Sequence, residues 1–131
     1  MQAEFSDNRS VKIFGHTRNV PRLMDAADLL ISKPGGLTTS EAMAKGLPMI
    51  TINPIPGQEE RNARYLHRHG AAEGAETLED LVQRVQDLFT HRDRLENLRG
   101  RVLALARPHA AYAAAESVLN ILGEPVFWRP E

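Results

Sequence analysis

The feature that most constrains this chain is an apolar run that ends at two adjacent glycines. Residues 28–32 are Asp-Leu-Leu-Ile-Ser, and residues 33–36, Lys-Pro-Gly-Gly, interrupt the run. A short continuous apolar run with polar ends predicts a strand that is buried on both faces, as in a parallel sheet. Residues 37–45 have helical character and precede Gly46, which suits a helix end. The sequence therefore predicts a strand, a glycine turn and a helix in direct succession.

Similar units flank this one, and together they predict the fold class. The expected strands are residues 11–14, 28–32, 48–52 and 71–73. The expected helices are one that follows Asn19, residues 37–45 and 58–69, one that follows Thr77, and residues 92–106 and 108–122. Strands that alternate with helices in short units predict right-handed crossovers and a parallel sheet. The predicted fold is α/β, with a partial Rossmann-like parallel sheet of three or four strands flanked by helices.

The small number of strands points to an incomplete domain. A typical sheet has about five or six strands, so we expect the chain to begin partway through a larger domain. Within the chain we expect a tail at residues 1–10, the domain at residues 11–123 and a second tail at residues 124–131.

Composition excludes several classes of function. The 131 residues include 16 basic and 17 acidic ones, and the net charge of −1 argues against a nucleic-acid-binding protein that depends on a positive field. The absence of cysteine excludes disulfides, thiolate metal sites and a cysteine nucleophile. His67 and His69 cannot share a helical face, so we expect no metal site. No apolar run approaches the roughly 20 residues of a membrane span, and the first residues lack a signal-peptide layout, so we expect a cytoplasmic protein.

The glycine turn has the composition of an anion-binding site. Because it follows a strand, it belongs to the carboxyl edge of the predicted sheet, where ligands bind in open α/β folds. Gly35 and Gly36 lack Cβ atoms, so a phosphate can approach backbone amides at the positive end of a helix. Thr38 and Thr39 add hydroxyl donors, and the Glu41 carboxylate can accept hydrogen bonds from a ribose diol. The alternative is a tight turn with an ordinary helix cap.

A proline-rich loop, residues 53–57, follows the next predicted strand and emerges at the same edge. Its prolines fix backbone φ angles, which reduces the ordering cost when a ligand binds. Gln58 and Glu59 begin the following helix with amide and carboxylate groups that suit sugar hydroxyls. The alternative is a rigid connection followed by a solvated helix.

The loop after the first expected strand contains His16 and Thr17 and belongs to the same edge. Its backbone groups could bind a planar base. A histidine titrates near neutrality and can act in catalysis. A loop histidine more often packs or caps, however, so we assign His16 no catalytic role.

Three segments resemble a known family. Residues 27–42, ADLLISKPGGLTTSEA, resemble the signature of the C-terminal domain of GT-B glycosyltransferases. Residues 46–48, GLP, and residues 53–62, NPIPGQEERN, narrow the resemblance to family 28, and within it to monogalactosyldiacylglycerol synthases and processive diacylglycerol glucosyltransferases. The similarity extends from Val11 to Leu122 and implies the C-terminal half of a GT-B fold.

The resemblance implies a UDP-hexose donor substrate, with no separate cofactor and no metal in the transfer. The diphosphate would contact Gly35, Gly36 and Thr38, with help from Thr39. The ribose hydroxyls would contact Glu41. A helix dipole and backbone donors would stabilise the departing diphosphate of an inverting reaction.

The resemblance also implies contacts for the hexose and the base. The hexose hydroxyls would contact Gln58 and Glu59, and the main chain at His16 and Thr17 would bracket the uracil. These two contacts would lie on either side of the diphosphate.

The chain departs from the family pattern at its beginning. A full family member has an N-terminal domain that binds the lipid acceptor and supplies the general base, and neither this domain nor the early strands of the C-terminal domain have a counterpart here. We therefore expect the last third of such an enzyme, membrane-associated at full length, that alone binds UDP-sugar weakly and transfers nothing. Glucose and galactose donors are not distinguished.

Other interpretations remain open at this point. They are a nucleotide-binding module without transferase activity, an epimerase of the UDP-N-acetylglucosamine 2-epimerase type, and an interaction domain whose C-terminal helices bind a partner. A homodimer is also expected, through a face that the absent domain would otherwise cover.

Overall fold

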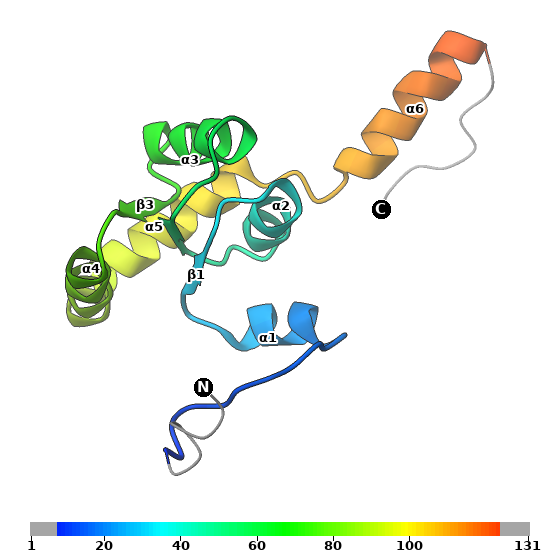
Figure 1. Ribbon diagram of the computed structural model, residues 1–131. Coiled ribbons are helices and arrows are strands. Elements are labelled where there is room, and N and C mark those ends of the chain that lie inside the picture. The colour runs from blue at the N-terminus through cyan, green and yellow to red at the C-terminus, as the bar shows by residue number, and fades with distance from the viewer. Residues whose placement is uncertain (1–7, 124–131) are drawn as a thin grey trace.

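The computed structural model describes residues 8–123, in which helices and strands alternate up to residue 90 and two further helices follow (Figure 1). The strands are β1 (Leu30–Ser32), β2 (Met49–Ile52) and β3 (Glu73–Ala75). The helices are α1 (Val20–Ala26), α2 (Gly36–Ala44), α3 (Gln58–Arg68), α4 (Leu78–Thr90), α5 (Arg92–Leu105) and α6 (Ala110–Leu122). The predicted α/β class is confirmed. The second expected tail, residues 124–131, and residues 1–7 of the first lie outside the described residues.

The strands form one three-stranded parallel sheet with β2 in the centre. Ile31 pairs with Ile50, and Thr51 pairs with Gly74. Because parallel strands end at the same edge of a sheet, the segments that follow β1 and β2 emerge as neighbours. These segments lead into α2 and α3. The carboxyl edge of the sheet therefore positions both of the motifs that were predicted to bind a ligand.

Helices cover both faces of the sheet at β2. Met49 and Ile50 are adjacent on this strand, so their side chains point to opposite faces, and both are fully buried. Met49 belongs to a core cluster with Leu66 of α3 and Val102 of α5, whereas Ile50 belongs to a second cluster with Leu88 of α4. The central strand has no solvent face, which explains its continuous apolar run.

The helix ends follow local rules. Thr77 caps α4, because its Oγ1 accepts a hydrogen bond from the Asp80 backbone N–H at 3.1 Å. Gly46 follows α2 with a φ of +63°, and a Cβ at this position would lie 2.7 Å from a Leu103 side-chain carbon of α5. A glycine is therefore required where the chain leaves α2 and approaches α5.

Two strand predictions were wrong. Residues 11–14 form no strand, and Val11, Ile13 and Phe14 are exposed. A strand requires a hydrogen-bonded neighbour, and the described residues provide none for this segment. The strand at β1 is not buried on both faces, since Ile31 is 41% exposed at this edge of the sheet. The remaining shifts are small: β3 begins at Glu73 rather than at residue 71, and α6 begins two residues later than predicted.

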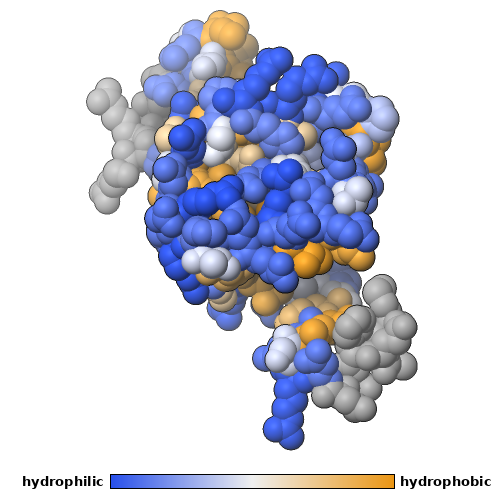
Figure 2. Space-filling view, turned by 90° about the vertical axis from the view of Figure 1, so that its left-hand side faces the viewer, coloured by the Kyte–Doolittle hydropathy of each residue, from blue (hydrophilic) through white to orange (hydrophobic). Residues whose placement is uncertain are grey.

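The last helix differs from the others in its surroundings. Figure 1 shows α6 extending away from the rest of the structure after the α5 end. None of its residues is buried, and Ile121 and Leu122 are strongly exposed. Seen from the left-hand side of Figure 1, the body has a mainly hydrophilic surface with smaller hydrophobic areas (Figure 2).

Candidate functional site

The start of α2 has backbone donors that are not used inside the protein. Gly35 is the N-cap, and its N–H donates to the Lys33 carbonyl at 2.9 Å. The first intrahelical bond runs from the Thr39 N–H to the Gly35 carbonyl at 2.9 Å. Within residues 8–123, the N–H groups of residues 36–38 therefore have no acceptor. Free amides at a helix start, together with the helix dipole, favour an anion.

The hydroxyl groups of this segment have different surroundings. Thr39 is buried, and its Oγ1 lies 2.9 Å from the Gly35 carbonyl oxygen and 3.0 Å from that of Gly36. Ser40 donates to the Gly36 carbonyl at 2.8 Å. Thr38 is half-buried, and its hydroxyl makes no hydrogen bond with any other described residue. Thr39 thus stabilises the helix start in this structure, whereas Thr38 retains a hydroxyl that a ligand can use.

The start of α3 is held by its own acidic side chains. Gly57, the N-cap, has a φ of +97°, a value that glycine adopts without strain. The Glu60 carboxylate accepts a hydrogen bond from the Gly57 N–H at 3.3 Å, and the Glu59 Oε2 accepts one from the Ile55 N–H at 2.7 Å. Carboxylates at a helix start are stabilised by its dipole. The loop before α3 is therefore folded onto the first turn of the helix.

The structure brings the two helix starts together. The Gln58 Nε2 lies 3.6 Å from the position that a Cβ would occupy on Gly36, and the Glu59 Oε1 lies 4.0 Å from the corresponding position on Gly35. Asn62, one turn further along α3, donates from its Nδ2 to the Pro34 carbonyl at 2.9 Å. The amide, the carboxylate and the free backbone donors thus surround one place at the carboxyl edge of the sheet.

Glu41 lies on α2, three residues after Thr38, so the two side chains share one side of the helix. Its carboxylate is exposed and has no hydrogen-bond or ion-pair partner in the part of the chain that the structure describes. It does not point into the core. The contact of Glu41 with a ribose stays a prediction.

No described contact joins the remaining candidates to this edge. His16 is exposed, and the Thr17 Oγ1 accepts a hydrogen bond from the Asn19 N–H at 3.1 Å within the same loop. Between residues 8 and 123, no hydrogen bond connects this loop with the glycine turn. A contact of this loop with uracil also stays a prediction.

Comparison with known proteins shows the family of the chain. Residues 1–112 match the model of the glycosyltransferase family 28 C-terminal domain. The chain belongs to glycosyltransferase family 28. The predicted resemblance is confirmed, and the partial parallel sheet is consistent with the C-terminal half of a GT-B fold.

The relatives of this family 28 chain are longer than the chain itself. It is 34% identical over 123 residues to the processive diacylglycerol beta-glucosyltransferase of Staphylococcus epidermidis (strain ATCC 12228 / FDA PCI 1200). The matched region covers 94% of this chain and 32% of that relative. It is 35% identical over 122 residues to the enzyme of the same description from Staphylococcus haemolyticus (strain JCSC1435), with 93% and 31% covered. The chain thus spans about a third of the length of the curated relatives it matches.

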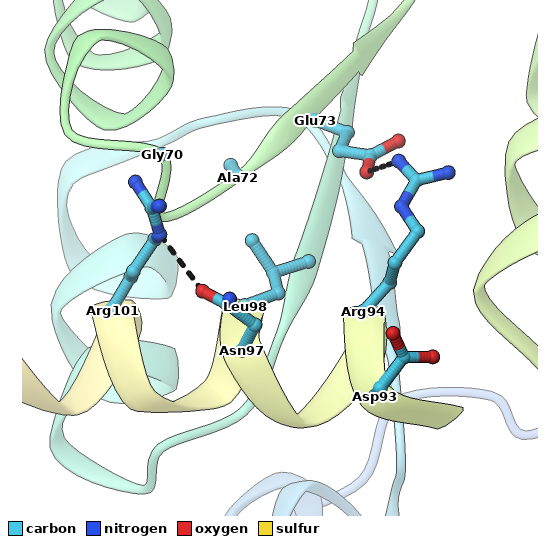
Figure 3. Close-up of a pocket in the computed structure, with 8 residues that line it drawn as sticks. All are labelled: Gly70, Ala72, Glu73, Asp93, Arg94, Asn97, Leu98 and Arg101. Carbon is cyan, nitrogen blue, oxygen red and sulfur yellow. Dashed lines mark hydrogen bonds and ion pairs between the residues drawn. The ribbon is translucent and has the colours of Figure 1, made fainter. Parts of the chain in front are cut away.

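A pocket, which we call the hollow, lies at the edge of the sheet opposite the candidate site (Figure 3). It has a volume of about 310 Å³ and is lined by Gly70, Ala72, Glu73, Asp93, Arg94, Asn97, Leu98 and Arg101. Arg94 donates to the Glu73 carboxylate at 2.9 Å, and Arg101 donates to the Asn97 side-chain oxygen at 3.0 Å. Because Glu73 begins β3, this hollow lies at the amino edge of the sheet. Its charged groups join β3 to α5, so we assign it a structural role.

His67 is a further polar group that sequence reasoning did not place. Although the residue as a whole is exposed, its Nε2 lies 2.8 Å from the hydroxyl of the buried Thr51. Burial lowers the pKa of His67, and the charge of Arg84 lowers it further, while a hydrogen bond with the Glu73 backbone acts in the opposite direction. The contact links the C-terminal end of α3 to β2. No signal in the sequence distinguished this histidine from the exposed His69.

The described residues offer neither a metal-binding cluster nor a membrane-spanning helix. They contain no group of three or more histidine and acidic side chains that could hold a metal ion. None of the helices seen between residues 8 and 123 has the length and apolar character needed to cross a membrane.

Proposed function

We propose that this chain is the UDP-sugar-binding part of an inverting hexosyltransferase that transfers glucose or galactose to a lipid acceptor such as diacylglycerol. The observation that carries the proposal is the arrangement of two helix starts at one sheet edge. Free N–H groups of residues 36–38 lie beside the amide of Gln58 and the carboxylate of Glu59. Such a place offers donors for a diphosphate next to polar groups for a sugar.

The two helix starts carry different chemical groups, so each suits a different part of the UDP-hexose. The start of α2 offers the free N–H groups of residues 36–38 together with the hydroxyl of Thr38, and therefore suits the diphosphate. The start of α3 carries the Glu59 carboxylate, which repels a phosphate but accepts hydrogen bonds from hexose hydroxyls. Glu41 would then accept from the ribose. The hexose would lie between α2 and the first turn of α3.

The same donors would assist the reaction. When the bond between the sugar and the diphosphate breaks, negative charge develops on the leaving phosphate. Fixed N–H donors and the dipole of α2 stabilise that charge without reorganisation, which is the basis of electrostatic catalysis. The lipid acceptor and the general base would belong to the part of the full-length enzyme that this chain does not contain. The isolated chain would therefore bind the donor weakly and transfer nothing.

Two measurements test this proposal. Saturation-transfer NMR with UDP, UDP-glucose and AMP should show binding of both uridine nucleotides and little binding of AMP. Incubation with radiolabelled UDP-glucose and diacylglycerol should give no glycolipid. Absence of binding with all three nucleotides would contradict the donor-binding role, and robust glycolipid formation would contradict the inactivity of the isolated chain.

A second candidate function is an interaction module without transferase activity. It is favoured by α6, whose exposed apolar residues include Val118, Ile121 and Leu122. A large exposed apolar face is typical of an interaction site, and a second copy of the chain is the simplest partner. Size-exclusion chromatography with light scattering distinguishes the cases: a dimer that is lost when Ile121 and Leu122 are changed to serine supports this role, and a monomer contradicts it.

A further inference from the structure

The two halves of the candidate site come from separate elements, so their spacing must be maintained by contacts between them. The diphosphate half is the start of α2, and the sugar half is the start of α3. In the described chain, a single hydrogen bond joins residues 33–44 to residues 53–69. It runs from the Asn62 Nδ2 to the Pro34 carbonyl at 2.9 Å.

Both ends of this hydrogen bond are well placed to hold the halves in register. Pro34 is almost fully buried, and its ring restricts the backbone directly before Gly35. Asn62 is half-buried and lies four residues after Gln58, so both side chains project from the same side of α3. The bond therefore fixes the helix face that presents Gln58 relative to the turn that presents the free amides.

We infer that Asn62 is a positioning residue, which sets the distance between the diphosphate-binding turn and the hexose-binding helix start. This inference rests on the proposed function of the site. A ligand that spans both halves needs the correct spacing, whereas a ligand that contacts only the diphosphate half does not. UDP-glucose binding should therefore depend on Asn62 more strongly than UDP binding does.

The substitution Asn62→Asp tests this role. It keeps the shape of the side chain but places a carboxylate oxygen against the Pro34 carbonyl oxygen, which removes the bond. We expect the affinity for UDP-glucose to fall about fivefold, the effect of roughly 1 kcal/mol of lost hydrogen-bond geometry, and the affinity for UDP to fall less than about twofold. Asn120→Asp, on the exposed surface of α6, is the matched control and should change neither affinity.

A second readout separates this inference from the proposed function. The backbone amide resonances of Gly35 and Gly36 report the position of the turn without any ligand. They should shift in Asn62→Asp and stay in place in Asn120→Asp. If the wild-type chain binds neither UDP nor UDP-glucose, the proposed function fails. The Gly35 and Gly36 amide resonances then still show whether Asn62 positions the turn.

Either of two results with Asn62→Asp would overturn the inference. One is that the Gly35 and Gly36 amide resonances do not shift, and the other is an equal loss of affinity for UDP and UDP-glucose. If Asn62→Asp does not fold, Asn62→Ala replaces it, because this change removes the donor without adding a charge. Circular dichroism first establishes that the variant is folded, and the same two readouts then apply.

Discussion

Two helices of this chain, α2 and α6, are both rich in small and apolar residues, but they have very different surroundings. In α2, Thr39 and Ala42 are buried, and the helix packs against α3 and α5. In α6, no residue is buried. Local sequence favours a helix in both segments, since each contains alanines and ends before a glycine. Tertiary contacts, however, fix the position of only the first.

This difference explains why the donor-binding site is assigned to the start of α2 and not to α6. A binding site requires groups at constant distances, and the start of α2 has them because α3 and α5 hold the helix. The apolar side of α6 offers area without a fixed arrangement of polar groups. Changes in the two regions should therefore produce effects of different size.

The largest effect is expected where α2 is tied to the core. Gly46→Ala places a Cβ against Leu103 at a positive φ, so the free energy of unfolding should fall by roughly 2 kcal/mol. Urea denaturation measures the change. Gly100→Ala is the control, because a Cβ at this exposed helical position meets no atom within 4 Å and alanine favours a helix. Equal stability of Gly46→Ala and wild type would show that α2 is not held in this way.

A smaller effect is expected on ligand affinity at the start of α2. Gly36→Val adds bulk where a phosphate would approach, while its Cβ makes only an ordinary contact with Gln58 at 3.6 Å. The affinity for UDP should fall about tenfold, or roughly 1.4 kcal/mol, with little change in unfolding. Isothermal titration calorimetry measures it. The same valine at Gly100 should leave the affinity unchanged, and unchanged binding by Gly36→Val would place the diphosphate elsewhere.

A pH effect is expected at the contact between His67 and Thr51. Burial lowers the pKa of His67 in the folded state below its ordinary value of 6.5. As the pH drops past 6.5, the unfolded chain therefore binds more protons at this residue than the folded chain does. The stability that neutral His67 provides is complete above pH 6.5 and is lost as the pH falls toward the folded pKa. Urea denaturation between pH 7.5 and pH 5 should show this loss in wild type relative to His67→Gln. If the free energy of unfolding varies with pH in the same way in wild type and His67→Gln, the loss comes from titratable groups other than His67.

The smallest effect is expected in α6. Changing Ile121 and Leu122 to serine should alter the free energy of unfolding of the body by less than about 0.5 kcal/mol, because neither side chain is buried. Urea denaturation followed by the NMR resonances of Leu66 and Leu95, which are buried in the body, is a suitable measurement. A loss of 1 kcal/mol or more would mean that α6 packs against the body, and the contrast with α2 would disappear.

The sequence predicted those parts of the fold that depend on neighbouring residues. The apolar runs at β1 and β2, the glycine turn and the Thr77 cap are local patterns, and each was found close to its predicted position. Residues 11–14 carry an equally good strand pattern but form no strand, because pairing depends on a neighbour that the residues themselves do not specify. The exposure of Ile31 on β1 and the exposure of α6 likewise depend on contacts with residues far away in the sequence.

The candidate site was predictable in outline and not in detail. Parallel strands place the turns after β1 and β2 at one edge, so the closeness of Gly36 to Gln58 follows from topology. The inward donation of the Thr39 hydroxyl and the bond from Asn62 to Pro34 depend on side-chain orientation. A sequence pattern lists these residues as polar but does not show where their hydrogen bonds go.

A crystal structure of the chain with bound UDP tests the central claim most directly. We expect diphosphate oxygens within hydrogen-bond distance of the N–H groups of residues 36–38, with Glu41 facing the ribose. An empty start of α2 would contradict the account. So would UDP bound in the hollow between Arg94 and Arg101.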